Sequence, residues 1–196
     1  QITSLVNGNG NVVKEIIDFL KRPGITTGAL LFITHEAFIR LPYFNRPSDW
    51  TIIIDEEPKY PKAFSWNLPA SSSLISSYLG VKEFNPLIYE LIRSPSVTKK
   101  DFDQYVDRLS KDDLGQQVKE LFQHVRNPKI RVLIEKQVWE RHHLKSSKRD
   151  VKFTVVSILS PRFLRKFKRV IMMSAMLSDC LMIKVWKNQG VEFLSF

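Results

Sequence analysis

The stretch that decides the fold is Trp50-Thr-Ile-Ile-Ile-Asp-Glu-Glu-Pro58. Its isoleucines show no polar alternation, which is typical of a strand covered on both faces in a parallel α/β sheet. The strand delivers Asp55 and Glu56 to its carboxyl end, where open α/β sheets build their ligand sites. An ordinary acidic turn, ended by Pro58, would use the same residues, so the flanking segments have to decide between the two interpretations.

The flanking segments alternate between strand and helix patterns. Towards the N-terminus, the sequence predicts strands over 2–6 and 29–33 and helices over 12–20 and 35–41. Towards the C-terminus, it predicts a short helix over 161–168, a strand over 170–174, a helix over 177–187 and a strand over 191–196. Alternation of this kind favours an α/β fold with a parallel sheet.

A long segment interrupts this pattern. Residues 74–80, 84–93, 99–110 and 112–125 have helical patterns, residues 130–143 fit a helix or a strand, and residues 151–159 fit a strand. The sequence therefore predicts an α/β domain over 1–60 and 160–196. A mostly helical inserted subdomain, large enough to have its own core, is predicted over 61–159.

Asp55 and Glu56 have the chemistry of a nucleotide-hydrolysis site. In P-loop ATPases an aspartate at the end of such a strand holds the magnesium ion that bridges the phosphates. An adjacent glutamate can act as the general base on the attacking water. On this interpretation the cofactors are ATP and Mg, and Asp55 is the residue on the metal side.

Three motifs, in order, resemble the first RecA-like domain of superfamily 2 helicases. They are Thr34-His35-Glu-Ala-Phe after a strand, Asp55-Glu56-Glu57-Pro58, and Ser174-Ala175-Met176. They look like motif Ib, motif II (Walker B) and motif III of that family. The resemblance implies a RecA-like parallel sheet flanked by helices. It also implies that Asp55 serves magnesium, Glu56 the water and Ser174 interdomain coupling, while Thr34 and His35 lie near a nucleic-acid strand.

The chain also departs from the family. Glu57-Pro58 replaces the usual end of motif II, and Met176 replaces the threonine of motif III. No G-x-x-x-x-G-K-[ST] loop occurs, although this is the loop whose amides and lysine hold the phosphates. In that family the loop lies upstream of motif Ib, so the resemblance implies that it precedes Gln1 and that a second RecA-like domain follows Phe196, as partners in one protein. The chain alone is not expected to hydrolyse ATP.

Positive charge is concentrated near the C-terminal part. The formal net charge is +10, and residues 141–169 hold ten Lys and Arg but only one acidic residue, Asp150. A patch this one-sided is typical of phosphate-binding surfaces, although a solvated basic face would have the same composition. The candidate nucleic-acid-binding residues here are Arg162, Arg165, Lys166, Lys168 and Arg169, with DNA favoured over RNA.

Other features exclude several classes of protein. The chain has a single cysteine, Cys180, which excludes a disulfide framework. This cysteine usage fits a reducing, intracellular compartment, cytoplasmic or nuclear. We expect Cys180 itself to be a buried, unreactive thiol. No apolar run approaches the roughly 18 residues of a membrane span, so no membrane partner is expected. His142-His143 lacks ligand spacing for a metal. Trp66 and Trp139 could stack on bases, but core packing is the favoured interpretation.

The sequence thus predicts part of an ATP-dependent nucleic-acid helicase or translocase. Two alternatives stay open. One is a non-catalytic nucleic-acid-binding or protein-interaction module on a helicase-like frame. The other is a fragment of a viral DNA-packaging ATPase, which also carries a Walker B strand.

Overall fold

A computed structural model describes residues 2–4, 12–22, 28–67, 72–109, 113–143, 152–174 and 177–194. The chain forms two compact units. The first contains Gln1–Pro58 and Pro161–Lys184, and the second contains Lys59–Ser160 and Val185–Phe196.

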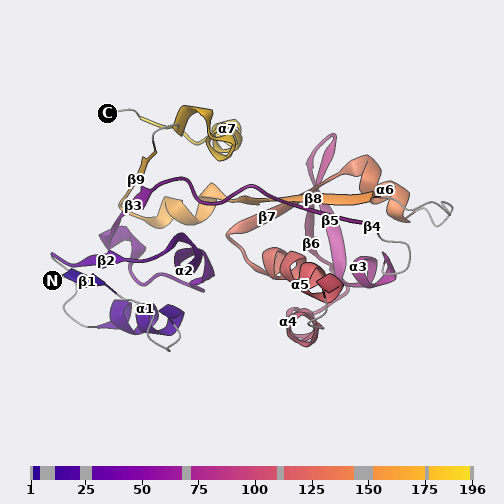
Figure 1. Ribbon diagram of the computed structural model, residues 1–196, viewed down its shortest axis with the longest axis horizontal. Helices are drawn as coiled ribbons and strands as arrows, with labels where there is room; N and C mark the ends of the chain where they lie inside the picture. The colour runs from indigo at the N-terminus through magenta and orange to yellow at the C-terminus, as the bar shows by residue number, and fades with distance from the viewer. Residues whose placement is uncertain are drawn as a thin grey trace. The chain divides into compact units, whose positions relative to one another are not determined.

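Part of the first unit is a small α/β layer (Figure 1). Strands β1 (Ile2–Ser4) and β2 (Leu30–Phe32) pair in parallel, and helices α1 (Val12–Lys21) and α2 (His35–Arg40) contact each other. The buried core side chains come from the apolar stripes of the two helices and the residue after α2: Ile16, Phe19, Leu20, Ala37 and Leu41. This spacing of apolar residues is the reason for the helices, because it gives each one a continuous buried face.

The first unit also contains a second pair of strands. Strand β3 (Thr51–Asp55) pairs in parallel with β9 (Arg169–Met173), in a register that runs from Thr51 opposite Arg169 to Asp55 opposite Met173. Short 3-10 helices lie beside these strands in the chain: η1 (Pro47–Asp49), η2 (Pro161–Lys166) and η3 (Leu177–Asp179). Helix α7 (Leu181–Asn188) follows η3, and the division between the two units falls within it.

The second unit is built on a five-stranded antiparallel sheet. Its strands are β4 (Lys62–Asn67), β5 (Leu79–Asn85), β6 (Ile88–Arg93), β7 (Ile130–Glu135) and β8 (Lys152–Leu159), in the order β4-β8-β7-β6-β5. The helices are α3 (Ser72–Tyr78), α4 (Lys99–Arg108), α5 (Asp113–Arg126) and α6 (Lys136–His143). Helix α5 packs on β6 and β7, and α6 packs on β7 and β8.

Alternation along the central strands explains how this sheet is covered. On β7, Ile130, Val132 and Ile134 are buried, while Arg131 and Leu133 between them are only half-buried. Successive side chains of a strand point to opposite faces, so one face meets the helices and the other is partly open. Arg131 on the more open face pairs with Glu90 across the sheet, at 3.4 Å.

The structure confirms a mixed α/β chain and corrects two parts of the fold prediction. First, the described residues form two separate parallel pairs, β1–β2 and β3–β9, rather than one continuous parallel sheet. Second, the inserted region is not mostly helical. Residues 84–93, predicted as a helix, belong to the β5–β6 hairpin, and residues 130–143 are a strand followed by a helix.

A turn between β5 and β6 explains why these residues form a hairpin although their apolar spacing also fits a helix. Pro86 and Leu87 make the turn between the two strands, and the side chain of Asn85, the last residue of β5, accepts a hydrogen bond from the Leu87 N–H at 2.9 Å. Such turn residues favour chain reversal. The predicted C-terminal strand is also wrong over 191–194, which contain no strand, while 195–196 lie outside the described residues.

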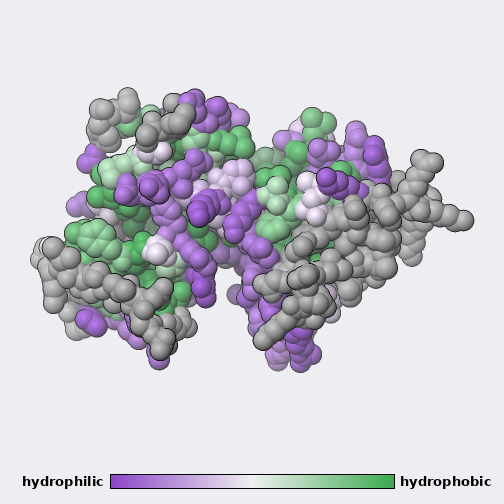
Figure 2. Space-filling model, in the orientation of Figure 1, coloured by the Kyte–Doolittle hydropathy of each residue, from purple (hydrophilic) through white to green (hydrophobic). Residues whose placement is uncertain are grey.

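Not every apolar side chain of the first unit is covered. Figure 2 shows hydrophobic residues at the surface over the β1–β2 part of this unit, where Leu30 and Phe32 are 44% and 57% exposed. Ile53 on β3 is also exposed. Within the described residues, no helix is both long enough and apolar enough to cross a membrane.

Candidate functional site

The carboxyl ends of β3 and β9 bring the predicted motif II together with Ser174, the first residue of the predicted motif III. Asp55 ends β3 directly opposite Met173, and Ser174 follows Met173. The backbone N–H of Glu56 donates a hydrogen bond of 2.9 Å to the carbonyl oxygen of Met173. Residues more than a hundred positions apart in the sequence therefore lie side by side at one edge of this sheet.

Local packing explains why the acidic residues lie at the surface here. The side chain of Ile54 is buried, so its two neighbours on β3, Ile53 and Asp55, point the other way and are exposed. Pro58 is buried again and ends the acidic turn. Buried Ile54 and buried Pro58 therefore anchor the turn at its two ends, while the carboxylates of Asp55, Glu56 and Glu57 reach solvent.

The backbone of Glu56 has a left-handed conformation, with φ of 67°. A residue with a β-carbon adopts this region at a cost of about 1–2 kcal/mol, and such outliers cluster at functional sites. The hydrogen bond from Glu56 N–H to Met173 holds the turn in this conformation. The strained residue is the one that the sequence predicts to be the general base.

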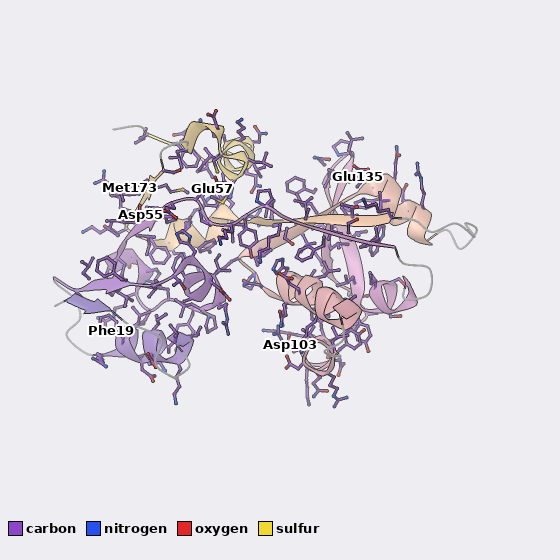
Figure 3. The ribbon with its side chains drawn as sticks, viewed as in Figure 1. Phe19, Asp55, Glu57, Asp103, Glu135 and Met173 are labelled. Atoms are coloured by element: carbon purple, nitrogen blue, oxygen red, sulfur yellow. The ribbon has the colours of Figure 1, made fainter. Side chains whose placement is uncertain are left out.

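An open pocket of about 670 Å³ lies at this edge of the sheet, lined by Asp55, Glu56, Glu57, Met173 and Ser174. Figure 3 shows Asp55, Glu57 and Met173 close to one another at the ends of β3 and β9. All five lining residues are exposed. The three predicted catalytic residues therefore share one pocket.

Cys180, between η3 and α7, contacts this site. Its thiol Sγ lies 2.7 Å from Glu57 Oε1, and the cysteine itself is 5% exposed. Burial raises the pKa of the Cys180 thiol, and the hydrogen bond to Glu57 raises it further. The thiol therefore stays protonated at neutral pH and donates its hydrogen to the carboxylate.

The pocket fits a magnesium ion only in combination with another ligand. Within the described residues, no group of three or more His, Cys, Asp or Glu side chains is arranged to hold a metal ion. Magnesium usually binds one or two carboxylates and completes its shell with water and substrate phosphates. The exposed carboxylate of Asp55 fits that kind of site, in which a nucleotide supplies the remaining oxygens.

The predicted nucleic-acid-binding residues gather around an aromatic cluster. Phe38 on α2 lies 5.6 Å from Phe163 on η2 and 5.9 Å from Phe167, measured between ring centroids. Phe44 lies 4.9 Å from Phe167. These half-buried rings hold α2 beside the basic segment, whose charged side chains are all exposed: Arg162, Arg165, Lys166, Lys168 and Arg169.

Thr34 has a structural function within this arrangement. Its hydroxyl oxygen accepts a hydrogen bond of 3.1 Å from the Ala37 N–H, which makes Thr34 the N-cap of α2. His35 is the first residue of the helix and is half-buried. Thr34 therefore sets the start of α2 whether or not a nucleic-acid strand is bound.

The basic segment and the carboxylate pocket lie at opposite ends of β9. Arg169 begins the strand opposite Thr51, and Met173 ends it opposite Asp55. At roughly 3.3 Å per residue, the two ends are about 13 Å apart. None of the predicted nucleic-acid-binding residues lines the pocket. The structure thus shows two surfaces on one strand pair rather than a single combined site.

A second polar cluster lies inside the second unit and lacks access to substrate. His124 Nδ1 is 2.8 Å from Ser157 Oγ, and His124 Nε2 is 3.8 Å from Glu120 Oε1. The order serine, histidine, carboxylate is that of a nucleophilic triad. However, Ser157 is 0% exposed, so no substrate can reach its hydroxyl. This cluster is part of the core.

The remaining candidates are settled only in part. Trp139 is buried and packs near Phe153, with 6.5 Å between ring centroids, which confirms the core interpretation. The side chains of Trp66, His142 and His143, as well as Ala175 and Met176, lie outside the described residues.

Sequence reasoning missed two pocket residues, Glu57 and Met173. The apolar run of residues 170–174 favours a buried side chain at Met173, yet this side chain is 47% exposed. Its position at the end of a strand, just before Ser174, was the available signal. Glu57 could have been noticed as a third consecutive carboxylate, but its partner Cys180 could not be inferred from the sequence.

Comparison with known proteins gives no identification. No protein-family model, no curated protein and no solved structure matches this chain.

Proposed function

We propose that this chain is part of a nucleic-acid-stimulated ATPase of the helicase or translocase type. The observation that carries the proposal is the parallel pairing of β3 with β9, which gathers Asp55, Glu56 and Ser174 around one pocket. The motifs that suggested these residues are far apart in the sequence. Their meeting at the carboxyl ends of parallel strands is what a ligand site in an α/β sheet requires.

In this proposal each residue has a separate task. Asp55 would hold a magnesium ion, which would neutralise charge on the phosphates of a bound ATP. Glu56 takes the proton of the attacking water, from a turn whose left-handed backbone places it at the end of β3. Ser174, directly after β9, lines the same pocket. The chain has no G-x-x-x-x-G-K-[ST] loop, so another segment has to hold the phosphates.

The basic segment supports the nucleic-acid part of the proposal. Exposed Arg and Lys side chains bind the phosphate backbone and make the affinity depend on salt. The aromatic cluster of Phe38, Phe44, Phe163 and Phe167 holds this segment beside α2, where His35 lies. A strand bound on this surface would lie at one end of β9, with the nucleotide at the other.

The proposal is tested with the full-length protein by measuring ATP hydrolysis with and without single-stranded DNA. We expect stimulation by the strand, and we expect Glu56→Gln to abolish hydrolysis while ATP still binds. Glu135→Gln, which removes an exposed carboxylate from the second unit, is the matched control and should leave hydrolysis unchanged. Equal activity of wild type and Glu56→Gln would refute the proposed site.

The second candidate is a nucleic-acid-binding module without ATPase activity, which the exposed basic segment favours. Reversing the charge of Arg165, Lys166 and Lys168 should weaken single-strand binding and lower the salt slope by about 2, at roughly 0.7 per phosphate contact. The same reversal at Lys99, Lys100 and Arg108, which are exposed on α4, is the control. Strand binding through this segment without any stimulated hydrolysis would favour the module.

A further inference from the structure

A single hydrogen bond connects two segments that are 123 residues apart in the sequence. It joins Sγ of Cys180, which is buried, to Oε1 of Glu57, which lines the pocket. An ionised carboxylate only accepts hydrogen bonds, so the thiol is the donor. The contact has no part in the mechanism proposed above.

Three consecutive carboxylates create a problem for a site that binds phosphates. Asp55, Glu56 and Glu57 all line the pocket, and like charges at such short range repel one another and an anionic ligand. Glu56 is fixed through its backbone by the bond to Met173. Glu57 is the one of the three whose carboxylate is held by a side-chain hydrogen bond among the described residues, through Cys180.

We propose that Cys180 is a positioning residue, whose thiol holds Glu57 against the pocket wall and so keeps this carboxylate away from the polyphosphate and magnesium of a bound nucleotide. This inference rests on the proposed function, which supplies Mg–ATP as the ligand of the pocket. In it, Cys180 itself binds no ligand. Without the thiol, Glu57 is free to compete with the phosphates for magnesium and to repel them.

The hydrogen bond is tested directly by infrared spectroscopy of the 196-residue chain. Its single cysteine gives one S–H stretching band, in a window where other protein groups do not absorb. We expect a band at the lowered frequency of a strongly bonded thiol, shifting towards that of a free thiol in Glu57→Gln. Glu56→Gln, the neighbouring carboxylate, is the matched control and should leave the band in place. A band unaffected by Glu57→Gln overturns the inference.

The functional consequence is tested by a double-mutant cycle on the affinity of the full-length protein for Mg–ATP. We expect Cys180→Ala to weaken binding about tenfold, the lower end of the range for the loss of one hydrogen bond to a charged group, and Cys180→Ser to restore it. In a Glu57→Gln background, Cys180→Ala should have no further effect, because the side chain to be positioned no longer carries a charge.

The outcomes separate this inference from the proposed function. If Cys180→Ala weakens binding equally in both backgrounds, the cysteine acts through packing and the positioning inference is wrong. If the wild-type protein binds no Mg–ATP, the proposed function fails, and a shift of the S–H band still decides whether the thiol holds Glu57.

Discussion

The buried imidazole of His124 makes the stability of the second unit sensitive to acid. His124 is 7% exposed and bonds to Ser157 through Nδ1. Burial lowers the pKa of His124 from 6.5 to about 4, with Glu120 opposing this change and Lys62 adding to it. The rings of Tyr60 and Phe64 lie beside it, at 6.0 and 5.2 Å between centroids. The imidazole is therefore neutral in the folded protein at neutral pH.

Acid consequently favours the unfolded state. Between pH 6.5 and about 4 the unfolded chain protonates this histidine while the folded protein does not, so the free energy of unfolding falls as the pH is lowered through this window. At about 1.4 kcal/mol per pH unit, the loss attributable to His124 is at most about 3 kcal/mol.

The assay is urea unfolding, followed by far-UV circular dichroism at a series of pH values, for wild type and His124→Asn. Asparagine stays uncharged and can still hydrogen-bond to Ser157. We expect wild type to lose about 3 kcal/mol more than the variant between about pH 7 and pH 4. Carboxylates elsewhere titrate in both proteins, so the difference isolates His124.

Two results would refute this reasoning. One is an equal loss of stability in wild type and His124→Asn. The other is an NMR titration of the His124 ring with a midpoint near 6.5 in the folded protein. Ser157→Ala serves as a control, because it leaves Nδ1 without its partner and should cost about 1–3 kcal/mol at every pH without changing the pH dependence.

Three further changes test local features. Glu56→Gly should unfold at an equal or higher urea concentration than wild type, because glycine relieves the left-handed strain. Glu56→Val should lower the free energy of unfolding by about 1–2 kcal/mol. Equal stability of the two variants would contradict the strained turn. Thr34→Ala should lower stability by about 1 kcal/mol through the lost helix cap, and Thr34→Ser should not, as urea unfolding can show. Trp186→Phe should cost about 1–2 kcal/mol in the same assay, since it removes the 2.7 Å hydrogen bond to the Leu159 carbonyl; an unchanged midpoint would exclude a stabilising bond.

The sequence predicts the first unit well for identifiable reasons. The isoleucines of β3 and the apolar run of β9 lack polar alternation, so both strands and the position of Asp55 after β3 could be located in advance. Helix α1 has a regular apolar stripe and was predicted within one or two residues. The direct pairing of β3 with β9 joins residues far apart in the sequence, and local patterns do not predict it. Only the order of the motifs suggested it.

The second unit was predicted poorly because its patterns are ambiguous. Residues 84–93 contain apolar positions that fit either a helix or two strands, and the turn at Pro86-Leu87 decides between them. Residues 130–143 change from strand to helix at Lys136 without a glycine or proline to mark the boundary. At the site, the Glu57 side chain is held by a hydrogen bond from Cys180, and no local sequence pattern could predict this contact.

The proposed nucleotide-hydrolysis site of Asp55 and Glu56 is tested most directly by equilibrium binding and turnover of ATP by the full-length protein. Both are measured with and without magnesium, for wild type, Asp55→Asn and Glu56→Gln. We expect Asp55→Asn to lose the magnesium-dependent part of the affinity, while Glu56→Gln binds Mg–ATP like wild type but does not hydrolyse it. If all three proteins bind ATP equally, with no effect of magnesium, the pocket at the ends of β3 and β9 is not an ATPase site.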